Sequence, residues 1–111
     1  MEWNKLIDIS QLDEINEASN AEKIMIFKHS TRCSISSSAL NRLERNWNDE
    51  KDALKIKPYY LDLIAHRDIS NGIAQKWNIE HESPQVLVIE NGKCTNHNSH
   101  LGIDYNDLMD L

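Results

Sequence analysis

Hydrophobic residues near the start of the chain first recur at helical spacing and then form a continuous run. After Ser10 they recur every three residues, and Ser10 with an acidic residue three positions later resembles a helix N-cap. This pattern predicts a first helix near residues 10–19. The run KIMIFKH at 23–29 does not alternate with polar positions, so it predicts a buried strand.

A second helical pattern begins at Cys33. Apolar residues then recur every four positions, which predicts a helix running to about residue 48. Cys33 is expected in its first turn. The buried face of this helix is expected to consist of Ile35, Ala39, Leu43 and Trp47.

The third pattern is another strand followed by another helix. KPYYLDLI is aromatic and apolar enough for a central strand, with its proline at the first position, where no ladder donor is needed. Asp68 is then expected to cap a helix. That helix is predicted to bury Ile69, Ile73 and Trp77.

The last third of the chain changes character. In SPQVLVIENGKCTNHNS the turn dipeptide Asn91-Gly92 separates an apolar run from a more polar one, which predicts an antiparallel hairpin. DYNDLMDL then predicts a short final helix. A βαβ unit, a helix, a hairpin and a last helix form the order of the thioredoxin fold, so we expect an α/β protein with a mixed four-stranded sheet flanked by helices.

Length and composition narrow the function. A chain of 111 residues, 40% hydrophobic, fits a single domain spanning residues 1–111. A net charge of -6 without a basic cluster disfavours nucleic acid partners. No apolar run reaches membrane-spanning length and no leader pattern opens the chain, so we expect no membrane partner and a cytoplasmic location. In such a reducing compartment the two cysteines are expected to act separately.

Cys33 lies in a stretch suited to a reactive thiol. No acidic residue occurs between Glu22 and Glu44, whereas Lys28, His29 and Arg32 lie within five positions of the cysteine. Nearby cations and a helix N-terminus favour the thiolate, which is the nucleophilic form. The alternative is a small buried hydrophobic residue beneath a helix start.

Two further features bear on this choice. Ser36 occupies the place of the second cysteine in a Cys-x-x-Cys pair, where its hydroxyl is expected to donate a hydrogen bond to a thiolate. Ser83-Pro84 precedes the apolar strand of the hairpin. Most X-Pro bonds are trans, but in the thioredoxin fold a cis proline at this point faces the active cysteine.

The segments HSTRCSIS, YYLDLIAHRDISNGIAQKW, HESPQVLVIENGK and HNSH resemble, in order and spacing, the monothiol bacilliredoxins, a thioredoxin-like family of bacillithiol redox chemistry. The resemblance covers roughly residues 3–110. It implies that Cys33 is the redox-active cysteine and that Ser83 and Pro84 face the substrate. The family usually has proline directly after the cysteine, where this chain has Ser34.

The resemblance also implies a reaction and its partners. The Cys33 thiolate would take bacillithiol from a protein mixed disulfide, and an external thiol would then release it. The expected partners are bacillithiol and bacillithiolated proteins, with bacillithiol as a co-substrate and no bound cofactor. Because bacillithiol is a cysteinyl glucosamine malate, Thr31, Arg32 and Lys28 are candidates to bind its acidic groups, and His100 is a candidate on the rim of the site.

Other signals allow other interpretations. Cys94, His97 and His100 have the spacing of a zinc site, but alternation along a strand would turn His97 away from the other two. The alternative for the two histidines is that they are surface or half-buried residues satisfied by hydrogen bonds, and Asp62 is either a buried proton acceptor or the exit of its strand. Rival functions are a monothiol glutaredoxin that carries an iron-sulfur cluster, whose Cys-Gly-Phe-Ser motif is absent here, and a thiol-sensing or binding module without turnover.

Overall fold

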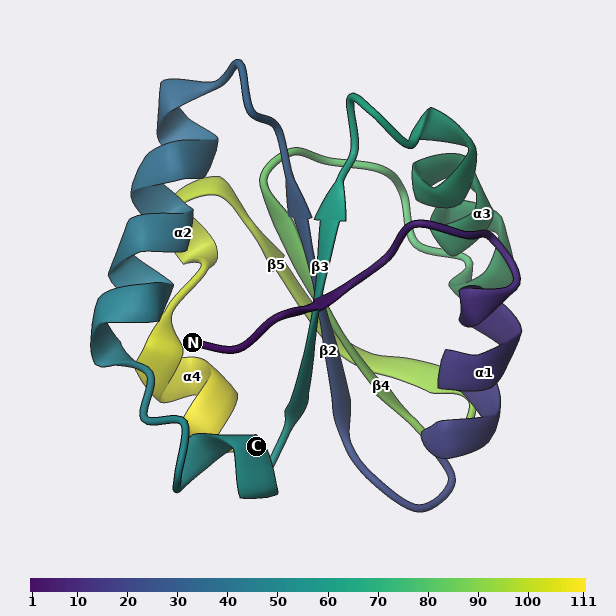
Figure 1. Cartoon of the computed structure of the whole chain (residues 1–111), viewed down its shortest axis with the longest axis horizontal. Helices are drawn as coiled ribbons and strands as arrows, with labels where there is room; N and C mark the ends of the chain where they lie inside the picture. Colours follow the sequence, from purple (N-terminus) through teal and green to yellow (C-terminus); the bar gives the residue numbers. More distant parts are fainter.

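The computed structural model describes all residues 1–111 as a sheet between two layers of helices (Figure 1). The strands are β1 (Asn4–Lys5), β2 (Ile24–His29), β3 (Lys57–Asp62), β4 (Gln85–Glu90) and β5 (Lys93–Ser99). The helices are α1 (Gln11–Ala18), α2 (Ser34–Asn46), α3 (Arg67–Trp77) and α4 (Tyr105–Met109), with short 3₁₀ turns η1 (Asp52–Leu54) and η2 (His100–Gly102). None of the helices combines the length and the hydrophobicity that crossing a membrane requires.

The sheet has the strand order β1-β3-β2-β4-β5. β1, β3 and β2 are parallel, whereas β4 and β5 are antiparallel to their neighbours. This mixed sheet confirms the predicted α/β thioredoxin-like fold. The fifth strand is β1, whose two exposed residues pair with Tyr59 and Tyr60. Two polar residues carry no periodicity, so the sequence pattern contains no signal for this strand.

Both faces of the sheet are covered, which explains why all six residues of β2 are buried. Ile24 and Ile26 pack in the core under α1 and α3, whereas Met25 and Phe27 pack in the core under α2 and α4. Figure 1 shows the sheet edge-on between these two helical layers. The strand therefore reads as a continuous apolar run because each side chain meets a core on its own side.

The predicted hairpin is confirmed at Asn91 and Gly92, which have φ angles of 51° and 74°. Both angles lie in the left-handed region that an Asn-Gly turn suits. The turn is attached to the end of α1, because Ser19 Oγ accepts a 2.8 Å hydrogen bond from Gly92 N. A register shift between Val88 and Ile89 adds one residue to β5.

The predicted burial of α2 is wrong at one position. Ile35 is 51% exposed, and the buried residues of this helix are Ser36, Ala39 and Leu43. Four residues of a helix turn through about 400°, so a strict four-residue repeat drifts around the helix. Residues spaced alternately three and four positions apart stay on one face of a helix. This spacing places Ser36, rather than Ile35, on the face toward the sheet.

Two predicted caps are also wrong in detail. α3 begins at Arg67 with His66 as its N-cap, so Asp68 lies in the first turn and does not cap the helix. Ser10 occupies the N-cap position of α1 but makes no side-chain cap bond. The Gln11 side chain instead accepts hydrogen bonds from the N–H groups of Ile7 and Asp8.

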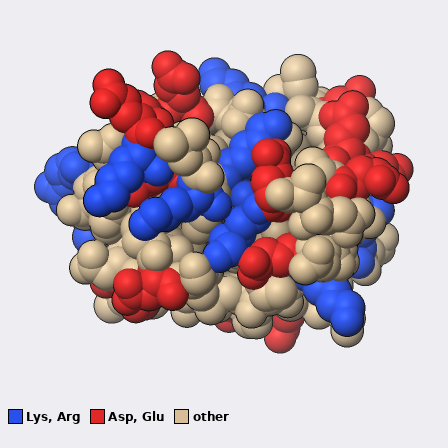
Figure 2. Space-filling model, turned by 90° about the horizontal axis from the view of Figure 1, so that it is seen from below, with Lys and Arg blue, Asp and Glu red and all other residues tan.

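Charged side chains of both signs are interleaved on the face seen from below in Figure 2. Two ion pairs lie at this end of the sheet, where β2 and β3 begin. Lys57 Nζ lies 3.7 Å from Glu22 Oε1, and Lys23 Nζ lies 3.7 Å from Glu90 Oε1. This face has no large patch of one sign.

Candidate functional site around Cys33

Cys33 lies at the opposite end of the sheet, just beyond the carboxyl end of β2 (upper end of Figure 1). It is the N-cap of α2 in an extended conformation, with φ −114° and ψ 119°, and its thiol is free and half-buried. The first turn of this 13-residue helix contains no acidic residue. The positive end of the helix dipole therefore acts on Cys33, and no acidic residue of the first turn opposes it.

The loop before Cys33 is a short turn. Cys33 N donates to Ser30 O at 3.2 Å, and Ser37 N donates to Cys33 O at 3.1 Å. Thr31 and Arg32 lie inside this turn and are exposed. Both side chains are thus available to a ligand that approaches the thiol.

Ser36 does not have the environment expected for a donor to the thiolate. It is fully buried, and its Oγ accepts a 3.0 Å hydrogen bond from Ser30 N. The same Oγ lies 2.7 Å from His29 Nδ1. Ser36 therefore connects the end of β2, the loop and α2, and its hydroxyl is already used.

His29 is the partner of this hydroxyl. The direction of this bond depends on the imidazole tautomer, because a hydroxyl that accepts from Ser30 N can either donate to an unprotonated Nδ1 or accept from Nδ1–H. Burial lowers the pKa of His29, although the carboxylates of Asp62 and Glu44 act in the opposite direction. Burial therefore favours the neutral imidazole.

The Ser83-Pro84 peptide bond is cis, which confirms the expectation from the thioredoxin fold. Ser83 lies just before the first ladder pair of β4, in which Gln85 is opposite Lys28 of β2. His100 N donates to Pro84 O at 3.1 Å, and η2 also contacts α2. His100 is exposed with a φ of 53°, and its backbone lies next to Pro84.

His97 and Cys94 lie elsewhere. His97 is opposite Leu87, whose side chain packs in the core under α1 and α3, so His97 faces away from α2. Cys94 is opposite Ile89 and packs against the same core. The prediction that these two residues lie on opposite faces is wrong, because the extra residue of β5 between them shifts the alternation. Burial raises the pKa of the Cys94 thiol.

Lys28 does not lie on the surface around Cys33. Its side chain is fully buried and its Nζ has no hydrogen-bond partner. It follows Ile24 and Ile26 at two-residue intervals, so it lies on the α3 side of the sheet, across from α2. Burial lowers its pKa from 10.5 to about 8.

Asp62 marks the exit of β3. Its Oδ1 accepts hydrogen bonds of 3.2 Å and 3.1 Å from the N–H groups of Ile64 and Ala65. The carboxylate therefore stabilises the turn that follows the strand. Of the two predicted roles, the strand exit is the one that this geometry supports.

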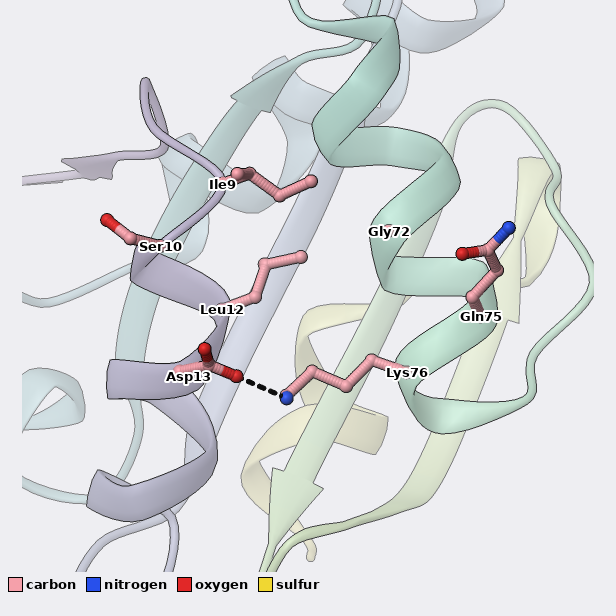
Figure 3. A pocket seen from close by; sticks show the side chains of 7 residues that line it. All are labelled: Ile9, Ser10, Leu12, Asp13, Gly72, Gln75 and Lys76. Carbon is pink, nitrogen blue, oxygen red and sulfur yellow. Dashed lines mark hydrogen bonds and ion pairs between the residues drawn. The ribbon is translucent and has the colours of Figure 1, made fainter.

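The largest hollow of the molecule lies between α1 and α3, has a volume of about 540 Å³ and is open to solvent. Figure 3 shows Ile9 and Leu12 pointing toward Gly72, where the missing side chain leaves room. An ion pair of 2.6 Å between Asp13 and Lys76 crosses it. None of its lining residues is a cysteine or histidine, so it offers no thiol chemistry.

Sequence reasoning missed several polar residues that the fold brings together near this end of the sheet. They are Arg67, Ser70, Asn71 and His81, which line a small hollow together with Leu63. The sequence contains one indication of these residues: Ser70 is a polar residue three positions after Arg67, between the apolar positions Ile69 and Ile73 of the helix. The closeness of His81 to the residues of α3 has no signature in the local pattern.

Comparison with known proteins agrees with this geometry. The family model described as monothiol bacilliredoxin BrxC matches residues 4–108. A solved structure provisionally described as an oxidoreductase with a thioredoxin fold is 32% identical, has a TM-score of 0.80, and the match covers 96% of this chain and 89% of that one.

Two thioredoxins are similar in fold at lower identity. The Malassezia sympodialis protein is 17% identical with a TM-score of 0.73, and the match covers 98% of this chain and 86% of that one. The Fasciola hepatica protein is 15% identical with a TM-score of 0.69 and coverages of 96% and 93%. At these identities the likeness concerns the fold alone.

Proposed function

The chain belongs to the monothiol bacilliredoxin BrxC family, and from this premise we propose that it removes bacillithiol from protein mixed disulfides with Cys33 as the nucleophile. The observation that carries the proposal is the position of Cys33. Cys33, whose thiol is half-buried, is the N-cap residue at the acid-free start of α2, at the end of the sheet where the cis Ser83-Pro84 bond also lies. A thiolate in such a place is suited to disulfide exchange.

In the first step the Cys33 thiolate attacks the bacillithiol sulfur of the mixed disulfide. The new Cys33–bacillithiol disulfide forms as the old disulfide breaks, and the substrate protein leaves as a thiolate that takes a proton from water. No net oxidation occurs, because one disulfide replaces another. The exposed side chains of Thr31 and Arg32 are our candidates to bind the leaving or incoming thiol, together with the Ser83-Pro84 segment and His100.

In the second step an external thiol attacks Cys33. The new disulfide joins that thiol to bacillithiol, and Cys33 leaves as a thiolate. The second cysteine of the chain does not take this role. Cys94 is opposite Ile89, which in turn is opposite Ile24 at the far end of β2, about 16 Å along the sheet from His29.

Ser34 changes the start of α2 relative to the family pattern. It is the first residue of the helix and is exposed. Unlike proline, serine has a backbone N–H, which adds a donor at the first residue of α2, directly after Cys33. We propose that this donor further stabilises the thiolate.

The first test is the intact mass of the protein after incubation with oxidised bacillithiol. We expect one bacillithiol adduct on the wild type and on the control Cys94→Ser, and none on Cys33→Ser. Oxidised glutathione should react more slowly. Equal modification of Cys33→Ser would contradict the assignment of the site.

Turnover is tested with a bacillithiolated substrate protein and free bacillithiol as the second thiol. Catalytic release of the substrate thiol supports the proposed enzyme. An adduct on Cys33 that free bacillithiol does not clear would instead indicate a thiol-sensing module. A visible absorbance band of an iron-sulfur cluster would indicate the glutaredoxin-like alternative.

A further inference from the structure

A hollow of mixed polar and apolar lining lies at the carboxyl end of β3, beside β1. It has a volume of about 270 Å³ and is lined by Lys5, Leu6, Ile7, Tyr60, Asp62 and His66. We call it the β3 hollow. Pockets for small molecules start at about 300 Å³, so this space suits a group of the size of one sugar ring.

The β3 hollow lies at the same end of the sheet as Cys33. β3 is the parallel neighbour of β2, and Asp62 is opposite His29, the last residue of β2. Both strands end at the upper edge of the sheet in Figure 1, where α2 begins. His29 contacts the first turn of α2 through Ser36, and its ring centroid lies 5.8 Å from that of Tyr60. The hollow is therefore one strand away from the strand that leads to the thiol.

Tyr60 and Lys5 face the side of the sheet that α2 covers. Side chains alternate along a strand, and the next residues, Leu61 and Leu6, both pack in the core under α1 and α3. Lys5 of β1 is directly opposite Tyr60 of β3. A ligand attached to the start of α2 thus meets these two side chains on its own side of the sheet.

The charged groups of the β3 hollow have capacity for a ligand. Asp62 uses Oδ1 to accept from the two N–H groups of its turn, which leaves Oδ2 for another donor. Lys5 takes part in none of the four ion pairs of the chain. A carboxylate oxygen and an ammonium are therefore both available, on neighbouring strands.

The order of these groups across the sheet matches the order of charges along bacillithiol. From Cys33 the strands on this side are β2, β3 and β1, so a ligand meets Asp62 and Tyr60 before Lys5. From its sulfur, bacillithiol has the cysteinyl ammonium, then the glucosamine ring, then the malate carboxylates. Adjacent strands are about 4.8 Å apart, so β1 lies about 10 Å from β2, a distance that the extended thiol spans.

We propose that the β3 hollow binds the bacillithiol part of the mixed disulfide, with Asp62 accepting from its ammonium, Tyr60 packing against its sugar and Lys5 pairing with its malate. This subsite rests on the proposed function, because that function supplies the ligand. The substrate protein then lies on the other side of β2, where the cis proline segment precedes β4. The two partners of one disulfide thus occupy opposite sides of Cys33.

Binding is tested by NMR titration of the Cys33→Ser variant with S-methyl bacillithiol, which cannot exchange its sulfur. We expect saturable shifts of the amide signals of Tyr60, Asp62 and His66. Glucosaminyl malate, a probe without the cysteinyl ammonium, should shift the same signals at higher concentration. Shifts confined to the cis proline segment and His100 would place bacillithiol on the β4 side and overturn the inference.

Substitutions then assign the two charges. Asp62→Asn keeps an oxygen for the turn but removes the charge, so it should weaken S-methyl bacillithiol by about tenfold and leave glucosaminyl malate unchanged. Lys5→Met should weaken both probes by about threefold, because an exposed ion pair contributes less. Lys57→Met and Asp110→Asn remove the same charges near the opposite end of the sheet and should change neither probe. Equal binding by all variants would contradict the subsite.

Adduct formation separates binding from thiol reactivity. With Cys33 present and oxidised bacillithiol below saturation, Asp62→Asn and Lys5→Met should form the adduct more slowly by the same factors. Bis(hydroxyethyl) disulfide has no charge for the hollow to bind, so it should react with both variants as fast as with the wild type. Equal slowing with both disulfides would mean that the variants changed the thiol itself, and would reject a binding role.

The two proposals can fail separately. Adduct formation on wild-type Cys33 at the same rate in all variants would keep the enzyme and remove the subsite. Saturable binding of S-methyl bacillithiol in the hollow, without an adduct from the oxidised form, would keep the subsite and reject debacillithiolation.

Discussion

A lysine in the centre of a protein sheet is unusual, and the burial of Lys28 has a cost in stability. Its aliphatic stem continues the apolar face of β2, while its amino group remains buried without a partner. Lys, Glu, Arg and Asp are almost never fully buried without a partner. Such a residue costs stability, which is common at sites that serve function.

Lys28→Met is expected to increase the free energy of unfolding at pH 7. The pKa of Lys28 falls from 10.5 to about 8 on folding, and one pKa unit corresponds to about 1.4 kcal/mol, so the gain is up to about 3 kcal/mol. Urea denaturation measures it. The control Lys57→Met, in an exposed ion pair, should change stability by less than about 0.5 kcal/mol.

The stability difference between wild type and Lys28→Met should change with pH, in a direction set by the lowered pKa of Lys28. Between pH 8 and 10.5 the unfolded chain holds the Lys28 proton that the folded chain has released, so stability rises with pH in this window. The difference between wild type and Lys28→Met should therefore shrink from pH 8 to 10.5. A constant difference would contradict the burial of an unpaired ammonium.

At the scale of elements, the start of α2 is held in place by one hydroxyl. Ser36 Oγ joins Ser30 of the loop and His29 of β2, at 3.0 Å and 2.7 Å. The strand, the turn that contains Cys33 and the helix are thereby fixed relative to one another. Ser36 thus positions the thiol without touching it.

Ser36→Ala is expected to lower the free energy of unfolding by about 1–3 kcal/mol, because two buried polar atoms lose their partner. It should also shift the titration of His29, because the imidazole loses its hydrogen-bond partner, and NMR titration measures this. Ser38→Ala, exposed on the same helix, is the control. Equal stability of both variants and an unchanged His29 titration would show that the hydroxyl does not hold the site.

At the scale of the whole molecule, two cores share one sheet. β2 and β4 contribute alternate side chains to the core under α1 and α3 and to the core under α2 and α4. Neither core is complete without these two strands. Separate unfolding of the two halves would expose one face of both strands to water, so we expect a single cooperative transition.

Single-tryptophan variants test this. Trp77 packs in the core under α1 and α3, whereas Trp47 packs in the core under α2 and α4. In variants that retain one of them and have phenylalanine at the other tryptophan positions, fluorescence in urea should give transitions that coincide with the loss of far-UV circular dichroism in the same variant. Two separate transitions within one variant would show that the predicted single domain is divided.

The pattern of the sequence was sufficient for the elements and for the position of the thiol. Continuous apolar runs predicted β2 and β4, Asn91-Gly92 predicted the hairpin, and the periodicity after Cys33 predicted a helix that begins there. These features depend on a residue and its near neighbours, because side-chain period and turn conformation are local properties. The family followed from short segments in the same order.

Only the tertiary structure decided which distant residues meet. Arg67 lines a hollow with His81 because α3 lies beside the segment that precedes β4, and Ser36 meets His29 because α2 packs back on its strand. One extra residue in β5 placed Cys94 and His97 on the same face. Register and layer packing are set by the whole core, so no local pattern contains them, and in a sheet a slip of one residue exchanges the two faces.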